Sequence, residues 1–313
     1  MKVVVTGGAG FIGANLCRVL CGRREVAEVV VVDDLSTGSL ANLDGLTITL
    51  IKESILNRSA LDVACAGAGS IVHLAAIPSV PRSVEDPLAS HAANATGTLE
   101  VLEAARRHGV GHVIVASSSS VYGANLLLPK HEGLCCEPMS PYAVSKLATE
   151  AYALAYRQCF GLSVLALRFF NVFGPLQPAG HAYAAVVPVF IDAALSDRPI
   201  PVNGDGTQSR DFTFIGSVTS VITDAVLRQV GASGPVNLAF GTRTTVLELI
   251  DELERVLGTP LPRVHRPPRA GDVPHSQADS SRLAALFPRL EPVPLSDGLR
   301  ATVDWFRSTM PVS

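Results

Sequence analysis

Apolar runs alternate with helix-forming stretches through the first half of the chain. Short runs rich in valine, isoleucine and leucine, which are typical of strands buried on both faces, occur at Lys2–Thr6, Glu28–Asp33, Leu46–Ile51, Ser70–Leu74, His112–Ser117 and Ser163–Arg168. Helical patterns cover Phe11–Leu20, Pro87–His108 and Pro141–Phe160. This alternation predicts an α/β fold, a Rossmann-type doubly wound parallel sheet with helices on both faces.

The second half differs in composition. Proline and glycine become more frequent, and helical patterns such as Thr245–Leu257 are shorter and more scattered. We expect residues 1–170 to form the sheet domain, joined by part of 210–242. Residues 171–313 are expected to form a smaller C-terminal α/β domain over the carboxyl edge of the sheet.

Composition narrows the functional classes. The chain has 313 residues, of which 48% are hydrophobic and 17% charged, so it can bury a substantial core. A net charge of −3 without a basic block argues against nucleic acid or an anionic membrane surface as the main partner. None of the six cysteines forms a C-x-x-C pair, and we expect no metal site. Without a leader pattern or an 18-residue apolar run, we expect a cytoplasmic protein with no membrane segment.

A glycine-rich loop follows the first predicted strand. Thr6–Gly13 reads TGGAGFIG and opens a predicted helix. Glycines in this context permit a tight turn, a close approach to a pyrophosphate and close helix packing. Asp33 ends the second predicted strand, where a carboxylate accepts hydrogen bonds from ribose hydroxyls and repels a 2′-phosphate. The pattern predicts dinucleotide binding, with NAD favoured over NADP, and makes residues 1–170 the NAD-binding domain.

A tyrosine and a lysine lie four residues apart in SPYAVSK, at Tyr142 and Lys146. On a helix they share a face. An ammonium beside a phenol lowers the pKa of the phenol, so Tyr142 could act as a base near neutral pH. The strand His112–Ser117 runs into Ser118, Ser119 and Ser120, where a hydroxyl could share the substrate proton.

Together these segments resemble a known family. TGGAGFIG, HLAA (His73–Ala76), SSSSVYG (Ser117–Gly123), SPYAVSK, RFFNVFG (Arg168–Gly174), GDGTQSRDF (Gly204–Phe212) and RAGDVPHSQAD (Arg269–Asp279) are similar, in order, to the extended short-chain dehydrogenases. Within that family the chain most resembles the UDP-hexose 4-epimerases, particularly those acting on UDP-N-acetylglucosamine and UDP-N-acetylgalactosamine.

The resemblance implies roles for individual residues. The catalytic group is Ser118, Tyr142 and Lys146. Contacts with NAD are implied for Gly7, Gly10, Phe11, Ile12, Gly13, Asp33, Ser54, Ile55, Ala75, Ala76, Asn94, Tyr142 and Lys146. Contacts with the UDP-sugar are implied for Arg82, Ser118, Ser119, Tyr142, Asn171, Arg210, Arg269, Asp272 and Ser276. Ser54 stands where the family often has an aspartate that binds the adenine amino group, so the adenine contact here is weaker or shared with Glu53.

Two positions separate reactions within the family. Dehydratases carry an acidic pair directly after the catalytic serine, and here those places hold Ser119 and Ser120. In epimerases, the residue seven after the Arg269 equivalent walls the sugar pocket, and Ser276 would leave room for an N-acetyl group. A solvent-facing serine in a shifted loop is the alternative interpretation.

We therefore expect reversible C4 epimerisation of a UDP-hexose through a 4-keto intermediate. The expected substrates are UDP-N-acetylglucosamine and its galacto epimer, and also UDP-glucose. The alternatives are a UDP-glucuronate 4-epimerase or decarboxylase and, in another class, a non-catalytic nucleotide-sensing protein. The helices Pro87–His108 and Pro141–Phe160 resemble those that pair in family dimers, so a homodimer is expected.

Overall fold

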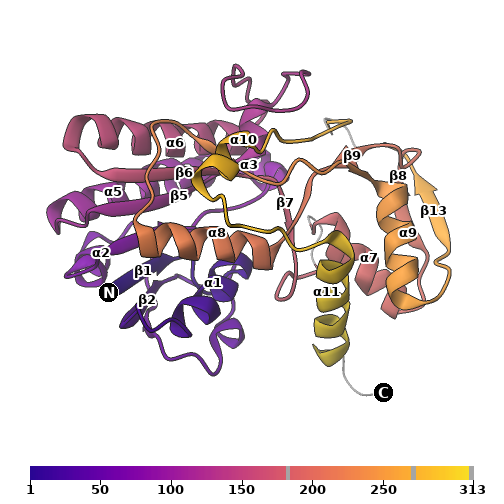
Figure 1. The fold of residues 1–313 in the computed structure, drawn as a ribbon, viewed down its shortest axis with the longest axis horizontal. Coiled ribbons are helices and arrows are strands. Elements are labelled where there is room, and N and C mark those ends of the chain that lie inside the picture. Colours follow the sequence, from indigo (N-terminus) through magenta and orange to yellow (C-terminus); the bar gives the residue numbers. More distant parts are fainter. Residues whose placement is uncertain (181–183, 269–272, 310–313) are drawn as a thin grey trace.

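A seven-stranded sheet forms the larger lobe of the computed structural model, which describes residues 1–180, 184–268 and 273–309 (Figure 1). The strand order is β11-β6-β5-β4-β1-β2-β3, and every neighbouring pair is parallel. The strands are β1 (Lys2–Thr6), β2 (Glu28–Val32), β3 (Thr49–Ile51), β4 (Ser70–His73), β5 (His112–Ser118), β6 (Ser163–Phe169) and β11 (Val236–Leu238). The predicted Rossmann-type fold is confirmed.

Helices cover both faces of the sheet. One face carries α1 (Phe11–Cys21), α8 (Ile215–Arg228) and α10 (Ser281–Leu286), and the other carries α2 (Arg58–Cys65), α5 (Gly97–Arg107) and α6 (Pro141–Phe160). Successive strand residues point to opposite faces. Val3 and Val5 therefore pack in the core beneath α1 and α8, whereas Val4 packs in the core beneath α2 and α5.

The smaller lobe lies at the right of Figure 1. Its core is built from α7 (Val186–Leu195), β8 (Ile200–Asn203), α9 (Val246–Leu257), β13 (Arg263–Arg266) and α11 (Leu295–Thr309). Strand β13 pairs with β8 in parallel. Two short ribbons join the lobes, a parallel one of β7 (Asn171–Phe173) and β10 (Phe212–Phe214) and an antiparallel one of β9 (Ser209–Arg210) and β12 (Thr244–Thr245).

Three differences from the sequence-based expectation concern the larger lobe. The helical stretch Pro87–His108 is divided into α4 (Pro87–His91), a π-helical turn η2 (Ala92–Thr96) and α5. The strand expected at Leu46–Ile51 pairs only over Thr49–Ile51. Short helices not expected from the sequence include η1 (Leu40–Leu43), α2, α3 (Val80–Glu85) and η3 (Ser119–Tyr122).

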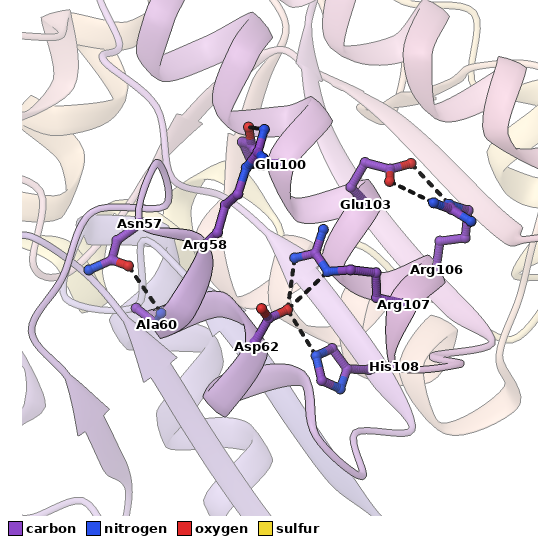
Figure 2. Close-up of polar contacts among 9 residues, drawn as sticks. All are labelled: Asn57, Arg58, Ala60, Asp62, Glu100, Glu103, Arg106, Arg107 and His108. Atoms are coloured by element: carbon purple, nitrogen blue, oxygen red, sulfur yellow. Dashed lines mark hydrogen bonds and ion pairs between the residues drawn. The ribbon is translucent and has the colours of Figure 1, made fainter.

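Ion pairs tie α2 to α5 on the outer surface of the larger lobe (Figure 2). Arg58 donates twice to the Glu100 carboxylate, each at 2.8 Å. Asp62 accepts from Arg107 at 2.7 Å and lies 2.9 Å from the His108 ring nitrogen. Solvent screens such exposed pairs, so the apolar faces carry most of the packing energy. Within the described residues, no helix is long and apolar enough to cross a bilayer.

Candidate active site

The glycine loop between β1 and α1 leaves no room for side chains. Gly7 has a φ of +72°, and a Cβ there would lie 2.6 Å from the Ala75 nitrogen. A Cβ at Gly13 would lie 2.1 Å from the Gly7 carbonyl oxygen, and one at Gly10 3.3 Å from the same oxygen. No side chain caps α1, so the free N–H groups of its first turn, including those of Phe11 and Ile12, are available to an anion. The loop fits a dinucleotide pyrophosphate.

Asp33 lies beside this loop, directly after β2. Its carboxylate accepts from the Ala9 N–H at 2.9 Å and from the Leu35 N–H at 2.8 Å. Burial raises the pKa of Asp33, and these two hydrogen bonds act in the opposite sense. The carboxylate is thus held at the carboxyl end of β2, next to the phosphate loop, where a ribose would lie in a bound dinucleotide.

The other residues expected at the cofactor lie at the same edge of the sheet. Ala75 and Ala76 follow β4, and the Ala75 N–H donates to the Thr6 hydroxyl at 3.3 Å. The Ser54 hydroxyl already accepts from the Leu56 N–H at 3.2 Å, which fits a weak contact with adenine. Ile55 is buried in the core beneath α2 and α5.

The catalytic candidates converge where β5 ends and α6 begins. Ser140 caps α6 by accepting from the Ala143 N–H, and Pro141 occupies the first helical position, so the helix starts one residue before Tyr142. Ser118 is the last residue of β5. Lys146, one turn after Tyr142, donates from Nζ to the Ala116 carbonyl at 2.9 Å. The sheet therefore anchors the lysine beneath the site.

The ionisation of these groups differs from the expectation. Burial raises the pKa of Tyr142, and a hydrogen bond with Ser118 acts in the opposite direction. Burial also lowers the pKa of Lys146 to about 8. The expected lowering of the Tyr142 pKa by Lys146 does not appear among these effects, because the lysine Nζ donates to the Ala116 carbonyl. A positive charge on a bound nicotinamide would favour the phenolate.

Asn94 clamps the catalytic helix to the loop after β4. Its amide accepts from the Ile77 N–H at 2.8 Å and donates to the Ser145 hydroxyl at 3.0 Å, and that hydroxyl donates to the Tyr142 carbonyl at 2.8 Å. Asn94 is 1% exposed and lies in the π-helical turn η2. The widened turn lets the amide face α6, which explains the division of the predicted helix.

A buried network of hydrogen-bonded polar side chains lies beneath the site, and the sequence did not reveal it. The ring of His73 lies 2.7 Å from the Thr6 hydroxyl and 3.0 Å from the Thr98 hydroxyl, which contacts the Thr149 hydroxyl at 3.1 Å. Burial first, and then the charge of Lys146, lowers the pKa of His73 to about 3. The neutral imidazole thus joins β1, β4, α5 and α6. The HLAA motif contained His73, but nothing local indicated its partners.

Two of the residues expected at the substrate, Arg210 and Ser276, meet at strand β9. Arg210 donates to the Ser209 carbonyl at 2.9 Å and to the Pro274 carbonyl at 3.3 Å. The Ser276 N–H donates to the Ser209 carbonyl at 3.0 Å. Ser276 is half-buried and lies beside Arg210 on a segment that pairs with β9.

Asp211 holds this ribbon to its surroundings, a role that the sequence did not reveal. The carboxylate is fully buried and accepts from the Gly241 N–H at 3.0 Å, the Thr242 hydroxyl at 2.9 Å and the Ala278 N–H at 3.2 Å. The Asp211 carbonyl accepts from the Asn171 N–H at 3.3 Å. Asn171 is thereby tied to the strand that follows Arg210.

The remaining candidates are placed as follows. Arg82 lies on α3, partly buried, and Ser119 begins the 3₁₀ turn η3 directly after Ser118. Arg269 and Asp272 lie outside the described residues. Among the residues that are described, no group of histidine, cysteine and acidic side chains could hold a metal ion.

Comparison with known proteins agrees with this geometry. A sequence profile of the NAD-dependent epimerase/dehydratase family matches residues 3–239. The UDP-glucose 4-epimerase of Mycolicibacterium smegmatis is 35% identical over 317 residues, which cover 98% of this chain and 99% of the relative.

Two solved structures share the whole fold. One is the UDP-N-acetylglucosamine 4-epimerase from Methanobrevibacter ruminantium M1 in complex with UDP-N-acetylmuramic acid, with a TM-score of 0.93, 35% identity and 99% coverage of both chains. The other is the UDP-glucose 4-epimerase from Thermotoga maritima with UDP-glucose, with a TM-score of 0.92, 33% identity and 99% coverage of both chains. With a phosphate loop, an Asp33 carboxylate and a Ser-Tyr-Lys group at one edge of the sheet, the chain belongs to the NAD-dependent epimerase/dehydratase family, and its cofactor is NAD.

Proposed function

We propose that this protein catalyses reversible 4-epimerisation of a UDP-hexose, with UDP-N-acetylglucosamine and UDP-N-acetylgalactosamine as its preferred pair. The observation that carries the proposal is the chemistry at the end of β5. Ser118, Tyr142 and Lys146 converge there, and the next two side chains, Ser119 and Ser120, are hydroxyls. Expulsion of water needs an additional acid and base at these positions, whereas epimerisation does not.

Each catalytic side chain has a separate task. Tyr142, as phenolate, takes the proton of the sugar O4, and the Ser118 hydroxyl donates a hydrogen bond that steadies the charge. Lys146, anchored on Ala116, supplies positive charge below the phenol. NAD, when bound, supplies the redox chemistry at C4. Asn171, Arg210 and Arg269 hold the UDP diphosphate while the 4-ketosugar turns over within the site.

The sugar preference rests on Ser276. Its backbone N–H donates to the Ser209 carbonyl, next to Arg210, so the proposed wall residue and the proposed phosphate ligand lie side by side at β9. A serine there leaves space that a bulky side chain would fill, and an N-acetyl group needs that space. The similarity to a UDP-N-acetylglucosamine 4-epimerase supports this choice, and the similarity to UDP-glucose 4-epimerases makes UDP-glucose a second substrate to test.

A panel of nucleotide sugars tests the proposal. The protein is incubated separately with UDP-N-acetylglucosamine, UDP-glucose, UDP-glucuronate and dTDP-glucose, and the products are separated. We expect C4 epimers, fastest from UDP-N-acetylglucosamine. Preferred turnover of UDP-glucuronate would favour the glucuronate epimerase or decarboxylase, and a dehydrated product would overturn the argument from Ser119 and Ser120. Binding without turnover of any sugar would indicate a nucleotide sensor.

We also propose that the protein is a homodimer that pairs through α3, α4 and α6. Apolar side chains on these adjoining helices face solvent in the single chain, among them Val84 (65% exposed), Leu88 (81%), Val144 (51%) and Tyr152 (41%). Exposed apolar side chains gathered on one face mark an interaction surface. The family resemblance implied a dimer contact through Pro87–His108, which contains α4, and through α6, and α3 is added here because it adjoins both.

A further inference from the structure

Ser120 contacts the catalytic hydroxyl of Ser118 twice. Its backbone N–H donates to Ser118 Oγ at 3.1 Å, and its own hydroxyl donates to the same oxygen at 2.9 Å. Both contacts form because the chain leaves β5 and turns at once into the 3₁₀ turn η3, which brings the second residue after Ser118 back over it. Both serines are partly buried at the carboxyl edge of the sheet.

These two contacts restrict where the Ser118 hydrogen can point. A serine hydroxyl has two acceptor positions and one hydrogen to donate. Ser120 fills both acceptor positions, so the hydrogen of Ser118 is directed away from Ser120. Tyr142 also forms a hydrogen bond with Ser118 that favours the phenolate, and the Ser118 hydrogen is the one that a phenolate can accept. The O–H chain from Ser120 through Ser118 also polarises the second bond in the direction of the phenol.

We infer that Ser120 is a positioning residue of this site, which orients Ser118 as a hydrogen-bond donor toward Tyr142 and the sugar O4. The inference rests on the proposed function for its catalytic consequence, but the orientation itself needs only the geometry of the three residues. A carboxylate at position 120 would accept a hydrogen bond and would turn the Ser118 hydrogen toward itself. A hydroxyl at position 120 therefore favours epimerisation because it donates to Ser118 and leaves the Ser118 hydrogen free for Tyr142.

The first test compares Ser120→Ala with Ser120→Thr. Alanine removes the hydroxyl and keeps the backbone donor, so one hydrogen bond of typical net strength is lost and kcat should fall roughly threefold to tenfold. The KM for the UDP-sugar should stay within about twofold, because the residues proposed to hold UDP lie on other elements than Ser120. The acidic limb of the kcat profile should move to higher pH, since a less stabilised phenolate forms less readily. Ser120→Thr keeps a hydroxyl and should restore both rate and profile.

A second measurement does not depend on the substrate. In the NAD-loaded enzyme, ionisation of Tyr142 is followed by ultraviolet difference titration, with Tyr142→Phe as the reference that isolates this phenol. The midpoint should be higher in Ser120→Ala than in the wild type, and Ser120→Thr should match the wild type. An unchanged midpoint in the alanine variant overturns the inference, as does a threonine variant that behaves like alanine. If no UDP-sugar is turned over by the wild type, the proposed function fails, while the titration still decides the role of Ser120.

Discussion

The ammonium nitrogen of Lys146 lies 2.9 Å from the carbonyl oxygen of Ala116, one turn of helix beyond the phenol of Tyr142. This hydrogen bond joins α6 to β5, two residues before Ser118. A buried ammonium held by a carbonyl keeps its place whichever protonation state Tyr142 adopts. Tyr142 can therefore gain and lose a proton without movement of the charge below it.

Replacement of Tyr142 by phenylalanine should abolish turnover and spare binding. The phenol is the proposed base, and general acid–base groups typically contribute about 10²–10⁴-fold to the rate. Asn171 and Arg210, which we propose hold UDP, lie on β7 and β9, so the Kd for UDP, measured calorimetrically, should change little. A kcat within about tenfold of the wild type would contradict the role of Tyr142 as general base.

NAD should co-purify with the protein, and Gly13→Ala should remove it. A Cβ at Gly13 would lie 2.1 Å from the Gly7 carbonyl oxygen, so the phosphate loop must open. Gly22→Ala is a matched control at the other end of α1, because its Cβ would meet the Val19 carbonyl oxygen at an ordinary 3.5 Å. Dinucleotide released by acid denaturation is quantified for all three proteins. Equal NAD content in the Gly13→Ala variant would show that the loop does not hold the pyrophosphate.

Ser276→Tyr should suppress reaction with UDP-N-acetylglucosamine far more than with UDP-glucose. The ring would occupy the volume that an N-acetyl group needs, whereas a 2-hydroxyl is smaller. Overpacking costs about 1–3 kcal/mol, which corresponds to roughly ten- to a hundredfold in kcat/KM. Retained turnover of UDP-glucose serves as the folding control. An equal loss for both sugars would argue for a role in folding or UDP binding, and no change would place Ser276 outside the pocket.

Leu88→Glu should convert the proposed dimer into a monomer. Leu88 is 81% exposed on α4, so a charge there costs nothing in the single chain and disfavours an apolar interface. Val63→Glu is the matched control, since Val63 is 68% exposed on α2 and outside the proposed contact. Light scattering at micromolar concentration reports the mass of each. A wild type that scatters as a monomer would refute the proposed dimer.

Acid should weaken the surface contacts of α5. Hydrogen bonds from Arg106 and then Tyr156 lower the pKa of Glu103 to about 2, so this carboxylate is more acidic folded than unfolded. Its contribution is therefore present above the unfolded pKa of about 4.3 and is lost as the pH falls toward 2. The Glu103 side chain is 29% exposed and its partner Arg106 is 47% exposed. Solvent therefore screens the pair, and the contribution of Glu103 is about 0.5 kcal/mol.

Thermal unfolding of Glu103→Gln at several pH values checks this expectation. The variant should melt about 1–2 °C below the wild type at pH 7, and the difference should shrink below about pH 4. Glu28→Gln, at the exposed start of β2, controls for the loss of one carboxylate. A difference that persists unchanged at pH 3 would mean that packing, and not charge, holds Glu103.

Much of the sheet lobe was readable from the sequence because its signals are local. The bounds of β1 and α6 agree with the predicted Lys2–Thr6 and Pro141–Phe160. An apolar run between turn residues defines the strand. A capping serine with proline at the first position, and Gly161 in a left-handed conformation at +69°, define the two ends of the helix. The glycine loop and the Tyr-Lys pair are likewise complete within a few consecutive residues.

Only the tertiary structure decided how distant segments meet. Asn94 faces Ser145 across 51 residues of sequence, and Asp211 accepts from Ala278 across 67. Their partners are backbone N–H groups and hydroxyls, which every segment offers, so residue type alone does not select among them. Burial makes such bonds necessary once the elements pack, because an unsatisfied buried amide or carboxylate is costly. The sequence by itself determined the main strands and helices of the sheet lobe and the chemistry that they carry. Long-range packing set the π turn and the contacts beside Arg210, because these depend on groups that become neighbours only in the folded chain.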